Sequence, residues 1–136
     1  MSDEVKPKLQ LKSLYERHSG LTPSLSGTFY EAASVCLNRH HESPVEIEIT
    51  RFAGKNTQLV EFQKPDARML NAWANDIDTT ESGAYGMCLA AVEVEEQLVA
   101  VRRAETLTGA DWYVAPIGTN PDDMESCCQS AKLVRM

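Results

Sequence analysis

The sequence predicts one α+β domain in which a mainly antiparallel sheet, built from two hairpins, is covered by two or three helices. Three observations support this. Residues 45–52 (VEIEITRF) alternate apolar and acidic side chains, which is typical of a half-buried strand. Apolar residues recur at helical spacing in residues 25–40 and 78–96. Residues 98–104 and 111–117 are rich in β-branched or aromatic residues and flank a Thr108-Gly109 turn signal.

The chain has 136 residues, 43% of them hydrophobic and 24% charged, which suits one soluble domain with its own core. Its net charge is −7, and its basic residues form no cluster beyond Arg102 and Arg103, which argues against broad nucleic-acid binding. The start is polar, and no apolar run approaches the roughly 18 residues that cross a bilayer. We therefore expect a cytoplasmic protein that does not associate with membranes.

The composition divides the chain into three parts. Residues 1–20 carry mixed charges and predict a flexible N-terminal segment, and residues 21–118 carry the globular domain. Residues 119–136 contain few large apolar side chains and predict a weakly anchored tail.

The first half of the domain begins with a helix that starts at Thr22-Pro23-Ser24 and runs to about His40. Strand 45–52, a turn over 53–56 and strand 57–62 follow. Asp66 is then expected to cap a short helix.

The second half begins with a long helix over residues 78–96, for which Asp78 and Glu81 have the spacing of a capping box. Gly83 and Gly86 each cost about 1 kcal/mol inside a helix, so we expect another backbone to approach closely there. Strand 98–104 and strand 111–117 complete the domain, and the second ends at Pro116 or lies at an edge.

Acidic residues in this half are the candidate site. Helical spacing places Glu81 at the end of the apolar stripe, facing the packed side, whereas Glu93, Glu95 and Glu96 are expected on a solvated face. Asp111 opens the last strand and Glu105 stands near the end of the one before it. Whether these two share a face depends on a register that the sequence leaves open.

A helix bearing Glu81, a strand, and a second strand opened by Asp111 resemble the front half of the PD-(D/E)xK nuclease-like core. The resemblance covers residues 78–118 and implies Glu81 and Asp111 as catalytic residues and ligands of Mg²⁺ or Mn²⁺. The E-x-K strand that should follow is not found, since Glu125 precedes Ser126 and Cys127, and Lys132 comes seven residues later. The catalytic half is thus degenerate, or the chain is shorter than its relatives.

Other polar residues allow two interpretations each. Cys36 and Cys88 lie on apolar stripes and are expected to pack in the core, while the adjacent Cys127 and Cys128 suit neither a zinc knuckle nor an ordinary disulfide. His40 and His41 cap the C-terminal end of a helix or act as ligands or proton carriers. The acids of residues 76–81 either compensate a helix dipole or form a hard-cation site.

The sequence thus predicts a small acidic domain that acts as a non-catalytic interaction or assembly module, with a protein partner or self-association. The alternative is a metal-dependent PD-(D/E)xK-like nuclease using Glu81 and Asp111, and it alone implies Mg²⁺ or Mn²⁺ and a nucleic-acid partner.

Overall fold

The computed structural model describes residues 9–52, 54–103, 112–119 and 132–134. Along the chain it contains η1 (Leu14–Glu16), α1 (Pro23–Asn38), β1 (Val45–Arg51), β2 (Gly54–Val60), α2 (Ala67–Ala72), α3 (Asp76–Glu96), β3 (Leu98–Arg103), β4 (Trp112–Pro116) and β5 (Lys132–Val134). The predicted α+β class with antiparallel strands is confirmed. No helix among the described residues is long and apolar enough to cross a membrane.

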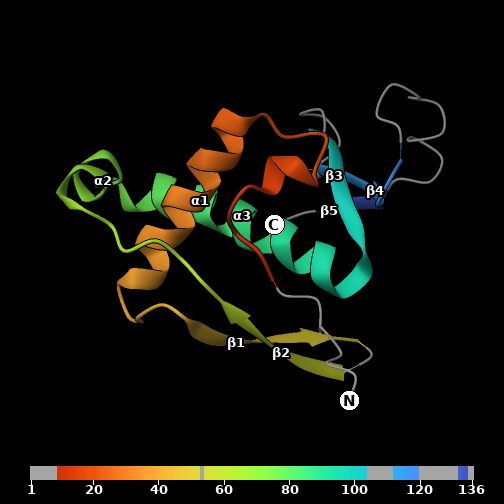
Figure 1. The fold of residues 1–136 in the computed structure, drawn as a ribbon, viewed down its shortest axis with the longest axis horizontal. Helices are drawn as coiled ribbons and strands as arrows, with labels where there is room; N and C mark the ends of the chain where they lie inside the picture. Colours follow the sequence, from red (N-terminus) through yellow and green to blue (C-terminus); the bar gives the residue numbers. More distant parts are fainter. Residues whose placement is uncertain (1–8, 53, 104–111, 120–131, 135–136) are drawn as a thin grey trace, which may run out of the picture.

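The strands form two sheets and not the single sheet that was expected. β1 pairs with β2 alone, and β3, β4 and β5 form a separate antiparallel sheet. Figure 1 shows the β1–β2 hairpin along the lower side of the view, with α3 between it and the three-stranded sheet. The two sheets are separate because the inner face of β1 packs on the helical core, and α3 lies between β1 and the strands β3 and β4.

The two long helices, α1 and α3, form the centre of the core and approach each other at two glycines. A Cβ atom on Gly83 would lie 3.3 Å from the Ala32 carbonyl oxygen, and one on Gly86 would lie 3.2 Å from the Phe29 carbonyl oxygen. The predicted close approach of another backbone is therefore confirmed at both positions.

Two of the three predicted helix caps are confirmed. The Thr22 side chain accepts a hydrogen bond from the Leu25 amide, and Asp66 accepts one from the Met69 amide. The capping box at Asp78 is wrong, because α3 begins two residues earlier and Asn75 caps it. The Asn75 side chain accepts a hydrogen bond from the Asp78 amide, and Asp78 therefore lies inside the first helical turn.

Within residues 1–20, which were expected to form a flexible segment, residues 9–20 pack against the core. Leu9, Leu11 and Leu14 are buried, and Leu14 is the first residue of η1. The Gly20 amide donates to the Ala100 carbonyl over 2.8 Å, and a Cβ on Gly20 would lie 2.6 Å from the backbone of Val101. Gly20 is thus the residue that lets this segment pack directly on β3.

The end of the chain contributes one strand. β5 pairs with β4, so residues 132–134 of the expected tail extend the sheet, and β4 ends at Pro116 as predicted. The expectations for Glu105, Asp111, Glu125, Cys127 and Cys128 fall outside the described residues.

Candidate functional site

The structure places one member of the predicted acidic pair. Glu81 is exposed on α3, so its expected orientation toward the packed side is wrong, and Asp111 lies outside the described residues. Among the residues that the structure describes, no group of three or more His, Cys, Asp or Glu side chains could hold a metal ion.

The other acids at the start of α3 have local roles. Asp76 pairs with Arg39 of the α1 C-cap over 2.9 Å, and Asp76 and Asp78 both stand in the first helical turn. Carboxylates there stabilise the positive end of the helix dipole. Of the two interpretations of this stretch, the described contacts support dipole compensation.

The remaining candidates do not gather at one place. His40 and His41 are exposed beyond the end of α1, where both amides bond to the Leu37 carbonyl. Cys36 and Cys88 are partly buried free thiols. Burial raises the pKa of the Cys36 thiol, with Asp76 adding to the effect and Arg39 opposing it, which keeps Cys36 a poor nucleophile.

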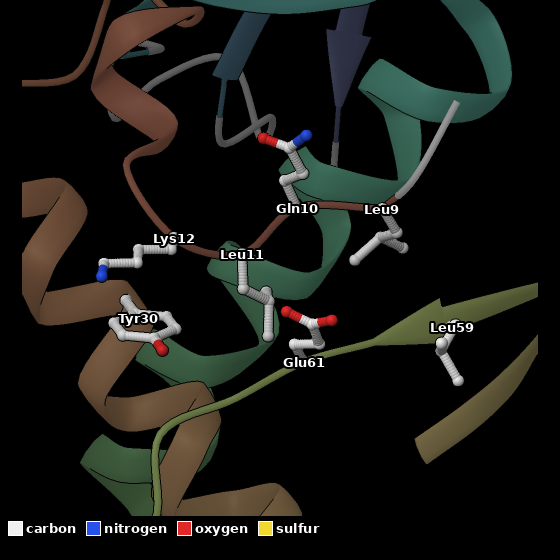
Figure 2. Close-up of a pocket in the computed structure, with 7 residues that line it drawn as sticks. All are labelled: Leu9, Gln10, Leu11, Lys12, Tyr30, Leu59 and Glu61. Atoms are coloured by element: carbon white, nitrogen blue, oxygen red, sulfur yellow. The ribbon is translucent and has the colours of Figure 1, made fainter. Parts of the chain in front are cut away.

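A surface groove lies beside the outer edge of β2. It has a volume of about 280 Å³ and lies between the N-terminal segment 9–12 and the chain that leaves β2 (Figure 2). Its lining consists of Leu9, Gln10, Leu11, Lys12, Tyr30, Leu59 and Glu61. Figure 2 shows the side chains of Leu11, Tyr30 and Glu61 converging in this space, while Gln10 and Lys12 point away from it.

Tyr30 supplies the neutral polar group of the groove. Burial raises the pKa of its phenol, a hydrogen bond with Ser34 lowers it, and the Glu61 carboxylate raises it, with a net upward shift. The phenol therefore keeps its proton at neutral pH and remains a hydrogen-bond donor beside the Glu61 carboxylate.

The first wall of the groove, segment 9–12, is held through residues 17 and 18, which follow it. Arg17 donates to Glu93 over 2.6 Å and to the Gln10 carbonyl over 3.1 Å. His18 is fully buried, and its Nδ1 accepts the Ala100 amide over 2.8 Å. That bond requires an unprotonated Nδ1, so Nε2 carries the proton and donates to Glu93 over 3.0 Å. Both ring nitrogens are thereby occupied, and His18 has a structural role.

Glu93 is the centre of this network. Burial raises the pKa of its carboxyl group, but the His18 hydrogen bond and the Arg17 charge outweigh burial and hold the pKa below its ordinary value. The carboxylate thus stays ionised and ties the N-terminal segment to the C-terminal half of α3.

The second wall, the β1–β2 hairpin, is held by Glu95. This side chain is only 5% exposed, and it accepts from Asn56 over 2.8 Å and from Gln58 over 3.4 Å. Arg51 donates to the Glu95 backbone carbonyl over 2.8 Å. The expectation of a solvated acidic run is therefore wrong for Glu93 and Glu95, because each carboxylate fixes one wall of the groove.

The outer edge of β2 presents regularly spaced backbone groups. Arg51 and Gly54 flank a two-residue turn, so they form a hydrogen-bonded pair, and the pairing continues without a bulge to Val45 and Val60. In an antiparallel ladder, only every second residue of β2 directs its backbone N–H and C=O groups toward β1. Lys55, Thr57 and Leu59 therefore direct their N–H and C=O groups away from β1.

Nothing in the described part of the chain pairs with that edge. No backbone hydrogen bond joins β2 to segment 9–12, and β1 is its only neighbour in the sheet. The hairpin turn carries Phe52, which is fully exposed. The site thus combines an unpaired strand edge, a small groove at one end of it and an aromatic residue at the other.

No family model, curated protein or solved structure matches the chain. The resemblance to the PD-(D/E)xK core stays a prediction.

The groove was not predicted because one of its walls, segment 9–12, lies within the N-terminal residues expected to be flexible. Leu9, Leu11 and Leu14 were the available signal, since Leu9 and Leu11 alternate in an extended stretch and Leu14 follows at the start of η1.

Proposed function

We propose that this protein is a non-catalytic interaction module that takes up an extended segment on the free edge of β2. The observation that carries the proposal is the row of outward backbone groups at Lys55, Thr57 and Leu59, which leads into the groove. An extended segment bonds to such a row as an added strand, and a neighbouring pocket then selects one side chain.

The size of the groove supports a side chain as its occupant. Pockets for small molecules commonly measure about 300–1,000 Å³. The groove, at about 280 Å³, stands at the lower end of that range, a size that suits one side chain. Its mixed lining of leucines, a phenol and a carboxylate fits a side chain with an apolar body.

The firm attachment of both walls also supports the proposal. Glu93 and Glu95 stand two residues apart on α3, and they fix segment 9–12 and β2 at a set separation. A preformed site loses less conformational entropy on binding than a site that must order first. A cytoplasmic location belongs to the same proposal, since Cys36 and Cys88 are free thiols.

The test uses proline to remove one outward amide at a time. Thr57→Pro removes an N–H from the free edge of β2, and Thr50→Pro removes the equivalent outward N–H from β1 without touching the ladder between them. Random ten-residue peptides displayed on phage are selected on dilute wild-type protein. Enriched peptides should bind wild type and Thr50→Pro equally and lose binding to Thr57→Pro. Equal binding to all three proteins, or no enrichment, would refute the proposal.

A further inference from the structure

We infer that the segment taken up by the β2 edge is β2 of a second copy of this chain, with Phe52 of each copy seated at the groove of the other. This inference rests on the proposed function and names its partner. It joins two features that are otherwise unexplained, the fully exposed Phe52 and the side-chain-sized groove.

Symmetry limits the possible registers. Two identical strands pair antiparallel about a two-fold axis, and an axis at Thr57, the midpoint of β2, uses the whole strand. Lys55 of each copy then stands opposite Leu59 of the other, and Thr57 opposite Thr57. All three are outward residues, so every pair exchanges its backbone hydrogen bonds.

Charge favours this register over a neighbouring one. An axis at Lys55 would place two lysines directly opposite each other, which is destabilising. The axis at Thr57 instead sets Lys55 diagonally across from Glu61 of the other copy, where long side chains of opposite charge reach each other. The dimer seam therefore opposes no like charges and brings two opposite-charge pairs together.

The same register brings the hairpin turn to the groove. Counting outward from Thr57, residue 52 of one copy is level with residue 62 of the other, next to Glu61 in the groove lining. An exposed phenylalanine thus meets a hollow lined by Leu9, Leu11 and Tyr30. Two such contacts form, one at each end of the shared seam.

The pairing leaves the contacts of the hairpin with α3 and the core unchanged, and only the Lys55 ion pair with Glu48, at 3.7 Å, is exchanged for one with Glu61. Asn56 and Gln58 face α3 and keep their bonds to Glu95, and Val45, Ile47 and Ile49 keep their places against the core. The product is a four-stranded antiparallel sheet in the order β1–β2–β2–β1. It covers the two β2 edges that would otherwise invite uncontrolled pairing.

Sedimentation equilibrium over a range of protein concentrations tests the inference. Wild type and Thr50→Pro should show the mass of a dimer at high concentration, and Thr57→Pro should remain a monomer. Phe52→Ser should raise the dimer dissociation constant about tenfold or more, from the loss of buried aromatic surface. Ile77→Ser, which removes another exposed apolar side chain from the first turn of α3, is the matched control and should leave the constant unchanged.

The outcomes separate this inference from the proposed function. A wild-type monomer that still binds selected peptides at the β2 edge would overturn the second copy as partner and leave the interaction module standing. A dimer that survives Thr57→Pro uses another surface and also overturns the inference. Circular dichroism of each variant confirms that the fold is retained, and Leu59→Pro, which removes another outward amide, replaces Thr57→Pro if that variant unfolds.

Discussion

The two antiparallel sheets of this protein bury their strands in different ways. In the three-stranded sheet, Leu98 and Ala100 of β3 face the main core, while Val99 and Val101 face a second apolar cluster on the opposite side. In the hairpin, β1 alternates between half-buried and exposed residues along its whole length. One sheet is buried on two faces and the other on one.

The difference shows which sheet stabilises the fold and which is available for binding. A strand buried on both faces contributes apolar burial from every residue. The hairpin attaches through three apolar side chains of β1, the buried Val60 of β2 and a set of polar bonds to α3. No described residue outside the hairpin pairs with its outer edges. The following predictions compare the two regions, from the largest expected effect to the smallest.

The largest difference is expected between two aromatic residues. Trp112 of β4 is 1% exposed and packs edge-on against Phe29 and Tyr85, with ring centroids 6.3 and 6.4 Å away. Trp112→Ala should lower the free energy of unfolding by about 3–5 kcal/mol. Phe52→Ala in the hairpin turn should change it by less than about 0.5 kcal/mol in dilute protein. Urea titration measures both, and equal losses would remove the distinction between the sheets.

The second prediction concerns the attachment of the N-terminal segment to α3 and β3. Glu93→Gln removes the charge shared by Arg17 and His18 and should cost about 1.5–3 kcal/mol. Glu96→Gln is the matched control, because its side chain is 44% exposed and pairs only with Arg51 over 3.3 Å among the described contacts. Thermal unfolding at pH 7 should place the control close to wild type.

The pH dependence of protein stability should also depend on the Glu93 carboxylate. The pKa of Glu93 is lower in the folded protein than its ordinary value of 4.5, so its contribution is fully present above that pH. As the pH falls through the folded pKa the contribution is lost. Wild-type stability should therefore fall more steeply below pH 4.5 than that of Glu93→Gln. Parallel pH profiles for the two proteins would contradict the role of Glu93.

The third prediction concerns the attachment of the hairpin. Glu95→Ala removes the acceptor for Asn56 and Gln58 and should cost about 1 kcal/mol of global stability. Its main effect should be local, with faster hydrogen exchange at the ladder amides of β1 and β2 and little change in β3 and β4. Faster exchange spread evenly over both sheets would show that the hairpin does not open on its own.

The smallest effects are expected in the helices that separate the sheets. Gly27 of α1 has open space around it, so Gly27→Ala should stabilise the protein by about 1 kcal/mol. Gly86→Ala gains the same helix propensity but forces a methyl group against Phe29, and a net loss of about 1 kcal/mol is expected. Opposite signs in thermal unfolding would confirm that α1 and α3 are in tight contact.

The sequence predicted those parts of the fold that depend on local pattern. Alternation in residues 45–52 indicated the hairpin, and Thr22 and Asp66 indicated helix starts. The separation into two sheets was not predictable from strand patterns, because it depends on α3 lying between them. Asn75 caps α3 in place of Asp78. Asn and Asp are both favoured N-cap residues, and each can accept a hydrogen bond from the amide three residues later, so the sequence did not decide between them.

The candidate site was harder to predict because its parts are far apart in sequence. Glu93 and Glu95 looked solvated next to Glu96, and only contacts to residues 17, 18, 51 and 56 bury them. His18 gave no signal because a lone histidine after an arginine is common in exposed segments. The groove combines residues 9–12 with 30, 59 and 61, a combination that no local motif contains.

Residue-resolved hydrogen exchange of β2 tests the central claim most directly. In dilute protein the inward amides of Asn56 and Gln58 should be protected, while the outward amides of Lys55, Thr57 and Leu59 exchange freely. Raising the protein concentration should protect the outward three without changing the inward two. Outward amides that are protected at every concentration, or at none, would contradict an open β2 edge that pairs with a second copy.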